Sequence, residues 1–173
     1  MFKELSERRI EIFLELLRSG KGLKISEIAK RIGMNQPKVT RNIEILEKAN
    51  FVVSTYVKGK RGVAKVCYPT FRGFFEPIAK EKKIKLTDED IKAIDNFFLH
   101  PKIKKIILFS GLIGVKKRKK GYTLEKLFEK APLRVRLFFA LTYGIEKAFD
   151  EVKNDKELQK LTRNFEKVLK KFL

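Results

Sequence analysis

The chain has 173 residues, of which 41 are Lys or Arg and 21 are Asp or Glu, so its formal net charge is +20 at pH 7. A basic excess of this size indicates a polyanionic partner, nucleic acid before all others. With 43% hydrophobic residues, the sequence excludes a disordered chain and predicts packed cores in one domain or two small ones.

Other classes are disfavoured by what the sequence lacks. A single cysteine, Cys67, excludes an internal disulfide and a cysteine-cluster metal site, which fits a reducing, cytoplasmic location. The apolar run 106–115 is too short to span a bilayer, which takes about 20 residues, so we expect no membrane contact. An archaeal or thermophilic source would also enrich Lys, but such proteins enrich Glu with it, and here the acidic residues lag.

The first predicted element is an amphipathic helix that begins near Ser6, a residue suited to capping a helix N-terminus. Gly20 and Gly22 are expected to end this helix. Its apolar side chains share one face and are expected to pack behind the next elements; they are Ile10, Phe13, Leu14 and Leu17.

Residues 25–51 predict two helices around a tight turn. After a short strand over 23–25, Ser26 is expected to cap a helix that ends at Gly33. Pro37 then sits in the first turn of a second helix, 37–49, where its missing N–H has no partner to lose. Asn50 follows at a position that favours a left-handed backbone. The pattern indicates a helix-turn-helix.

A β-hairpin is predicted next. Residues 51–57 and 63–68 are rich in β-branched and aromatic side chains, which favours two strands. Between them lies the sequence Lys-Gly-Lys-Arg-Gly, residues 58–62, a basic tip bounded by glycines.

This order of elements resembles the winged helix-turn-helix domains of the MarR and ArsR regulator families over residues 5–69. The stretch QPKVTRNIEILEKANFV is similar to their pattern of Val-Ser/Thr-Arg, then Leu-x-x-Leu-Glu-x-x-Gly and a hydrophobic residue. Asn50 stands where the families usually have Gly, and Ile45 where they usually have a polar residue. The resemblance implies DNA binding, dimerisation through helices outside the winged domain, and a possible small-molecule effector.

The remaining residues, 71–173, predict a helical domain. Expected helices cover 70–83, a segment capped by Thr87, 123–130, 132–153 and 155–172, and the stretch from Pro101 to residue 115 is most simply a helix, although a strand also fits. Aromatic side chains are dense here, which suits core filling, a dimer interface or a ligand pocket. The fold class is thus mainly α with a small β-hairpin wing, divided into domains 1–70 and 71–173.

The candidate site divides into side chains that read bases and side chains that hold the backbone. Arg and Lys pair with guanine, Gln and Asn with adenine, and Thr with either, so the expected base readers are Gln36, Lys38, Thr40, Arg41 and Asn42. Backbone contacts are expected from the hairpin tip and from the start of the helix that ends at Gly33; the residues are Ser26, Lys58, Lys60 and Arg61. A second basic run, 116–120, either grips flanking DNA or is a solvated helix end.

Catalysis has little support in the sequence. His100 is the single histidine, so no histidine pair is available for a metal, and no phosphate-binding loop motif is present. Cys67 is expected to be a small buried hydrophobe rather than a thiol sensor. We therefore expect no enzyme activity, cofactor or metal, and three functions stay open: a sequence-specific dimeric DNA-binding regulator, an architectural DNA binder, and a protein-interaction winged helix.

Overall fold

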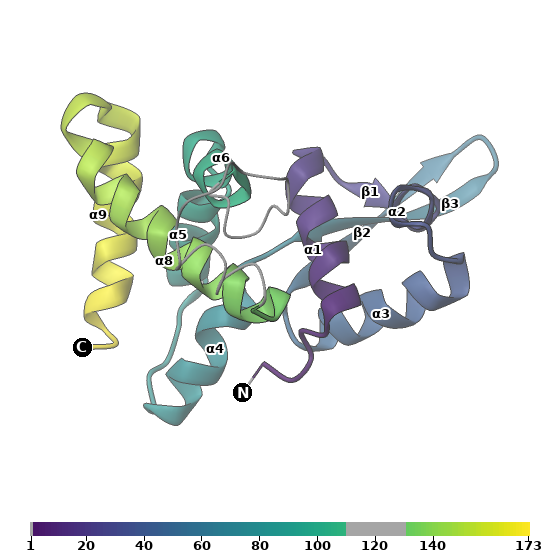
Figure 1. Ribbon diagram of the computed structural model, residues 1–173, viewed down its shortest axis with the longest axis horizontal. Coiled ribbons are helices and arrows are strands. Elements are labelled where there is room, and N and C mark those ends of the chain that lie inside the picture. Colours follow the sequence, from purple (N-terminus) through teal and green to yellow (C-terminus); the bar gives the residue numbers. More distant parts are fainter. Residues whose placement is uncertain (1, 110–130) are drawn as a thin grey trace. The chain divides into compact units, whose positions relative to one another are not determined.

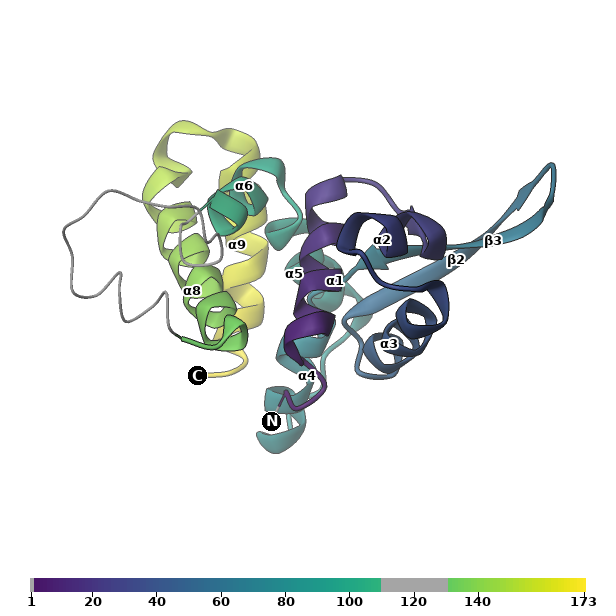
Figure 2. The same cartoon turned by 45° about the vertical axis from the view of Figure 1, so that its right-hand side comes forward.

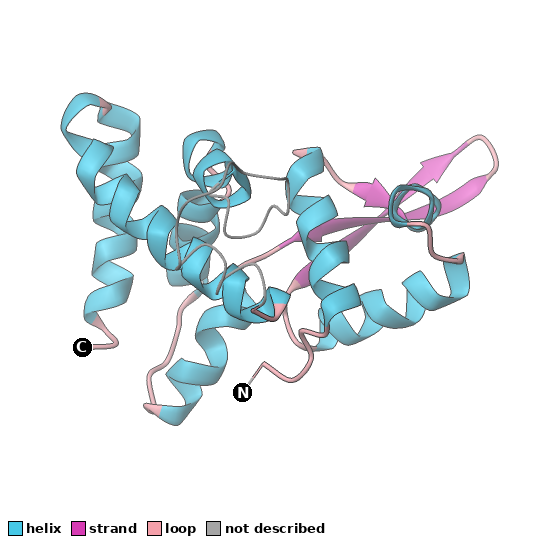
Figure 3. Ribbon diagram, in the orientation of Figure 1, coloured by secondary structure: helices cyan, strands magenta, loops and turns pink. Residues whose placement is uncertain are grey.

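A computed structural model describes residues 2–109 and 131–173, in which most residues are helical and the strands belong to one small sheet (Figures 1 and 3). The chain forms two compact units, Met1–Thr87 and Asp88–Leu173. The predicted fold class, a winged helix-turn-helix followed by a helical domain, is confirmed. Among the described residues, no helix combines the length and apolar character needed to cross a membrane.

Helix α1 covers Glu7–Ser19 and belongs to the first unit. As predicted, Ser6 caps it, with its hydroxyl accepting a hydrogen bond from the Arg9 backbone N–H, and Gly20 ends it in a left-handed conformation with φ of 64°. All the side chains of its apolar face are buried; they are Ile10, Ile12, Phe13, Leu14, Leu16 and Leu17.

Helix α2 covers Ile25–Ile32 and ends at Gly33, whose φ of 66° suits glycine. The expected cap at Ser26 is wrong. Strand β1 is short, Leu23–Lys24, and the helix follows it at once, so that Lys24 takes the cap position. The Glu27 carboxylate accepts the Lys24 backbone N–H at 2.8 Å and supplies the missing cap from inside the helix.

Helix α3 covers Gln36–Lys48, one residue earlier at each end than the sequence suggested. The shift follows from Asn35, whose side-chain oxygen accepts the Lys38 backbone N–H at 3.0 Å and so starts the helix before Pro37. Asn50 has a φ of 60°, as predicted for the residue where the chain leaves the helix.

The sheet has strand order β1-β3-β2, with β2 over Val52–Gly59 and β3 over Gly62–Pro69. Both pairings are antiparallel, and Gly59 lies opposite Gly62 at the hairpin turn. Leu23 of β1 pairs with Cys67 near the buried end of the hairpin. The opposite end, the wing tip, extends beyond α2 and α3 (Figure 2).

Helix α4, Arg72–Glu81, belongs to the first unit, which therefore continues past residue 70, the domain boundary expected from sequence. Gly73 allows α4 to pack closely against Ala49 and Phe51. A Cβ built there would lie 2.6 Å from the Ala49 carbonyl oxygen and 2.8 Å from the Phe51 ring, which leaves no room for a side chain. Phe74 completes the contact, with its ring centroid 4.9 Å from that of Phe51.

The second unit contains α5 (Asp88–Phe98), α6 (Pro101–Phe109), α8 (Leu133–Glu151), the short helix η1 (Val152–Asn154) and α9 (Lys156–Lys170). These agree with the helices predicted for the same stretches. The expected helix over 123–130, the end of the run to residue 115 and the basic run 116–120 lie outside the described residues.

Aromatic stacking forms the centre of the second unit. The rings of Phe97 and Phe165 are nearly parallel with centroids 4.3 Å apart, and Phe98 meets Phe165 edge-on at 5.3 Å. All three side chains are at most 1% exposed. Helices α5 and α9 are therefore held together mainly by buried apolar area.

Candidate nucleic-acid interface

Helix α3 has one buried and one exposed face. Val39, Ile43 and Leu46 are completely buried against the first unit. Because an α-helix turns 100° per residue, the opposite face carries the side chains of Arg41 and Lys48, with Lys38 and Glu44 on its two flanks. All four are exposed. The helix is thus anchored by its apolar stripe and presents a mostly basic surface to solvent.

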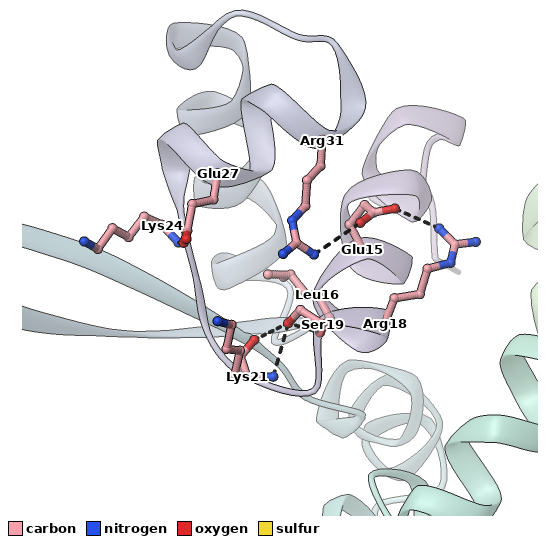
Figure 4. A network of polar contacts seen from close by, with 8 residues as sticks. All are labelled: Glu15, Leu16, Arg18, Ser19, Lys21, Lys24, Glu27 and Arg31. Carbon is pink, nitrogen blue, oxygen red and sulfur yellow. Dashed lines mark hydrogen bonds and ion pairs between the residues drawn. The ribbon is translucent and has the colours of Figure 1, made fainter.

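Arg41 and Lys38 differ from the arginines of the α1–α2 corner. Figure 4 shows Arg18 and Arg31 both directed at Glu15, with N–O distances of 3.0 Å and 3.8 Å. For Arg41 and Lys38, by contrast, no side-chain hydrogen bond or ion pair occurs within the part of the chain that the structure describes. Their charges are available to an external anion.

Two other expected base readers lie at the start of α3. Gln36 is exposed at the first position of the helix, and Thr40 is partly exposed one turn later. The Thr40 hydroxyl donates to the Gln36 backbone carbonyl at 3.0 Å, which satisfies its hydrogen while leaving its methyl group and lone pairs available.

Asn42 is engaged within the protein. Its side-chain oxygen accepts a hydrogen bond from Arg9 Nε at 3.0 Å, and its amide nitrogen donates to the Lys38 carbonyl at 2.9 Å. Arg9 also donates to the Glu4 carbonyl at 2.9 Å. These bonds tie α3 to the beginning of α1, and they occupy the groups that would recognise adenine.

The hairpin brings together three of the four residues expected to contact the DNA backbone. Lys58, Lys60 and Arg61 are exposed at the wing tip, where Gly62 adopts a φ of 115° that permits the tight turn. Ser26 is also exposed, in the first turn of α2. A surface hollow lies where α1 and α3 begin and adds a further basic side chain, Arg8; its lining is Ser6, Arg8, Gly33, Met34, Asn35, Lys38 and Asn42.

Sequence reasoning missed Glu47, which joins α3 to both long strands. Glu47 Oε2 lies 2.8 Å from Lys65 Nζ on β3, and the Ser54 hydroxyl on β2 donates to Oε1. Burial lowers the pKa of Lys65, but the hydrogen bond and charge of Glu47, with smaller contributions from Tyr56 and Cys67, raise it overall. The pairing of the two strands could have indicated this contact, because it places Ser54 and Lys65 on the same face of the hairpin.

Cys67 is completely buried on β3, which agrees with its expected role as a small core residue. Burial raises the pKa of its thiol, and this effect exceeds the opposing effects of the Ser54 hydroxyl and the Lys65 charge. The thiol is therefore protonated at neutral pH and is poorly suited to sensing oxidants.

His100 makes structural contacts at the start of α6. Its Nδ1 accepts the Lys102 backbone N–H at 3.3 Å, and its Nε2 lies 3.9 Å from a Glu157 carboxylate oxygen. Within residues 2–109 and 131–173, no three His, Cys, Asp or Glu side chains are grouped so that they could hold a metal ion.

Comparison with protein families gives a match within the first unit. Residues 5–55 match the model of a helix-turn-helix domain. This part of the chain is similar to that family. The match runs from α1 through α3 into β2, and it supports a DNA-binding function of the transcription-regulator type. The comparison with curated proteins gave no match.

Proposed function

We propose that the protein is a sequence-specific DNA-binding transcriptional regulator that places α3 in the major groove. The observation that carries this proposal is the exposed face of α3, on which Arg41 and Lys38 have no partner within the described residues although the helix itself is firmly anchored. An anchored helix with free donors is what direct base readout requires.

Each candidate side chain has a proposed role. Arg41 reads guanine from the centre of the exposed face, with Lys38, Gln36 and Thr40 toward the start of the helix. The exposed tip side chains Lys58, Lys60 and Arg61 hold phosphates, as does Ser26 in the first turn of α2. Asn42 contributes by holding α3 against Arg9, since its amide is already bonded there.

We further propose that the regulator is a homodimer of the MarR or ArsR type, in which the unit Asp88–Leu173 holds the second subunit. Support comes from α8, whose exposed apolar side chains include Val135, Phe139 and Tyr143, at 40%, 48% and 39%. Side chains of this kind are typical of subunit interfaces. A small-molecule effector between helices of this unit would fit the same family resemblance.

In vitro selection of random duplex DNA tests the proposal. Purified full-length protein is incubated with the random pool at roughly physiological salt, so that unspecific phosphate attraction is discounted. We expect an enriched, roughly palindromic site, because a two-fold dimer sets two copies of α3 in successive turns of the major groove. Retention without enrichment would indicate an architectural DNA binder, and no retained DNA would indicate a protein-interaction winged helix.

A further inference from the structure

Glu47 links the two parts of the candidate interface, helix α3 and the hairpin. It lies in the last turn of α3, and its carboxylate binds Lys65 on β3 and Ser54 on β2. The register sets Ser54 opposite Cys67 and Tyr56 opposite Lys65, so one carboxylate contacts both strands on the hairpin face that meets α3. We call Glu47, Ser54 and Lys65 the hinge cluster.

The cluster is sheltered and charged. The Lys65 and Glu47 side chains are 20% and 27% exposed, so their ion pair is less screened by salt than an exposed pair would be. The short Ser54 hydrogen bond satisfies the second carboxylate oxygen. Both oxygens of the Glu47 carboxylate are therefore engaged by the hairpin.

The hinge cluster lies far enough from the wing tip that a small tilt of the hairpin at the cluster displaces the tip. On the tip side of it Val57 and Val63 are 50% and 61% exposed, whereas Cys67, opposite Ser54, and Val52, farther from the tip, are buried. From Ser54 to the tip the strand rises about 17 Å, at roughly 3.4 Å per residue. A tilt of about 10° at the cluster would therefore move the tip by about 3 Å, enough to lose a hydrogen bond to a phosphate.

We infer that Glu47 is a positioning residue that fixes the direction of the wing relative to α3, so that the tip meets the DNA backbone when α3 lies in the groove. The inference rests on the proposed function. Glu47 itself makes no contact with DNA in this account. It acts through Lys58, Lys60 and Arg61, which are exposed at the tip.

The sign of the expected effect separates positioning from simple electrostatics. Removing a carboxylate from a DNA-binding surface should strengthen binding by Coulomb attraction alone. Glu44 is a matched control, because it lies on the same helix, is exposed, and has no side-chain partner among the described residues. Glu44→Gln and Glu47→Gln remove the same charge, but Glu47→Gln also breaks the hinge cluster.

The test measures affinity of the full-length variants for the duplex obtained by selection. We expect Glu44→Gln to bind as tightly as the parent or more tightly, and Glu47→Gln to bind about tenfold more weakly, within the range of coupled residues. In a background that carries Lys58→Ala, Lys60→Ala and Arg61→Ala together, Glu47→Gln should cost nothing further. Equal or tighter binding by Glu47→Gln, or an undiminished loss in the tip background, would overturn the inference.

Hydrogen exchange without DNA tests the same cluster independently. Amides of residues 55–64 should exchange faster in Glu47→Gln than in Glu44→Gln, while α1 keeps its protection. Unchanged wing exchange would overturn the inference. Faster wing exchange in Glu47→Gln, together with a parent chain that binds no DNA, would show that the cluster holds the wing and would overturn the proposed function. If Glu47→Gln does not fold, Ser54→Ala must show the same pattern at smaller amplitude, or the inference fails.

Discussion

The two units present different chemistry to solvent. In the unit Met1–Thr87, the exposed face of α3 and the wing tip present basic side chains. In the unit Asp88–Leu173, α8 presents aromatic and aliphatic side chains instead. This difference is the basis for the proposed polyanionic partner of the first unit and the proposed apolar partner of the second.

The units also use polar contacts differently. In the first unit, Arg9 with Asn42 and Glu47 with Lys65 join separate elements of the candidate interface. In the second unit the ion pairs also join separate helices, but at the helix ends, as between Lys171 after α9 and Asp90 in α5 at 2.6 Å. Because polar bonds require specific geometry and buried apolar area does not, the contacts of Asn42 and Glu47 constrain how α3 lies against its neighbours.

The largest expected effect tests whether the two units are separate. Phe165→Ala removes a completely buried ring that stacks on Phe97, and should destabilise the second unit by about 3 to 5 kcal/mol. Hydrogen exchange should then show lost protection in α5 and α9 with protection of α1 retained. Equal loss in both units would show that they unfold as one and would break the comparison.

Arg41→Ala tests the first unit. We expect specific DNA binding to weaken by about 1 to 3 kcal/mol and preference to relax at one base pair, because a bidentate contact to guanine is lost. Arg31→Ala is the control, since Arg31 lies on α2 and faces Glu15. Competition with single-base variants of the selected site measures both quantities. Unchanged affinity and preference in Arg41→Ala would remove Arg41 from the readers.

Asp155 tests the polar contacts of the second unit. Its carboxylate caps α9 by accepting the backbone N–H groups of Glu157 and Leu158, each at 3.1 Å, and pairs with Lys102. Asp155→Ala should destabilise this unit, and Asp155→Asn should destabilise it less, because asparagine also caps. Denaturant unfolding of the two variants measures the difference, and equal losses would argue against the cap.

The pH dependence of Asp155 follows from its environment. The hydrogen bond from Lys102, helped by the Leu158 backbone N–H, lowers the pKa of Asp155. The carboxylate therefore stabilises the fold fully above its unfolded pKa, near 4, and less as the pH falls through the lowered folded value. Unfolding measured in acid should show a flatter pH profile for Asp155→Asn than for the parent chain. Parallel profiles would contradict this.

The wing tip has the smallest expected effect. Lys60→Ala and Arg61→Ala should weaken binding about equally for all sequences and reduce the slope of log affinity against log salt by about 1 for each lost phosphate contact. A salt titration with the selected duplex and with a scrambled duplex measures this. A change of base preference would instead make these side chains readers.

Sequence periodicity predicted most of the fold because helix faces and strand alternation reflect burial directly. It located Val39, Ile43 and Leu46 in the core and Asn50 in a left-handed turn. It placed the α2 cap at Ser26, because it could not foresee that β1 would be short enough to give this position to Lys24. Contacts between distant residues, such as Glu47 with Ser54, depend on strand register and were not foreseen.

The central claim is that α3 and the wing tip together contact duplex DNA. Hydrogen exchange of the full chain with and without the selected duplex tests it most directly. The account predicts added protection at residues 36–48 and 58–62, with little change in α5 and α9. Protection confined to the unit Asp88–Leu173, or no protection at α3 in a protein that binds the duplex, would contradict it.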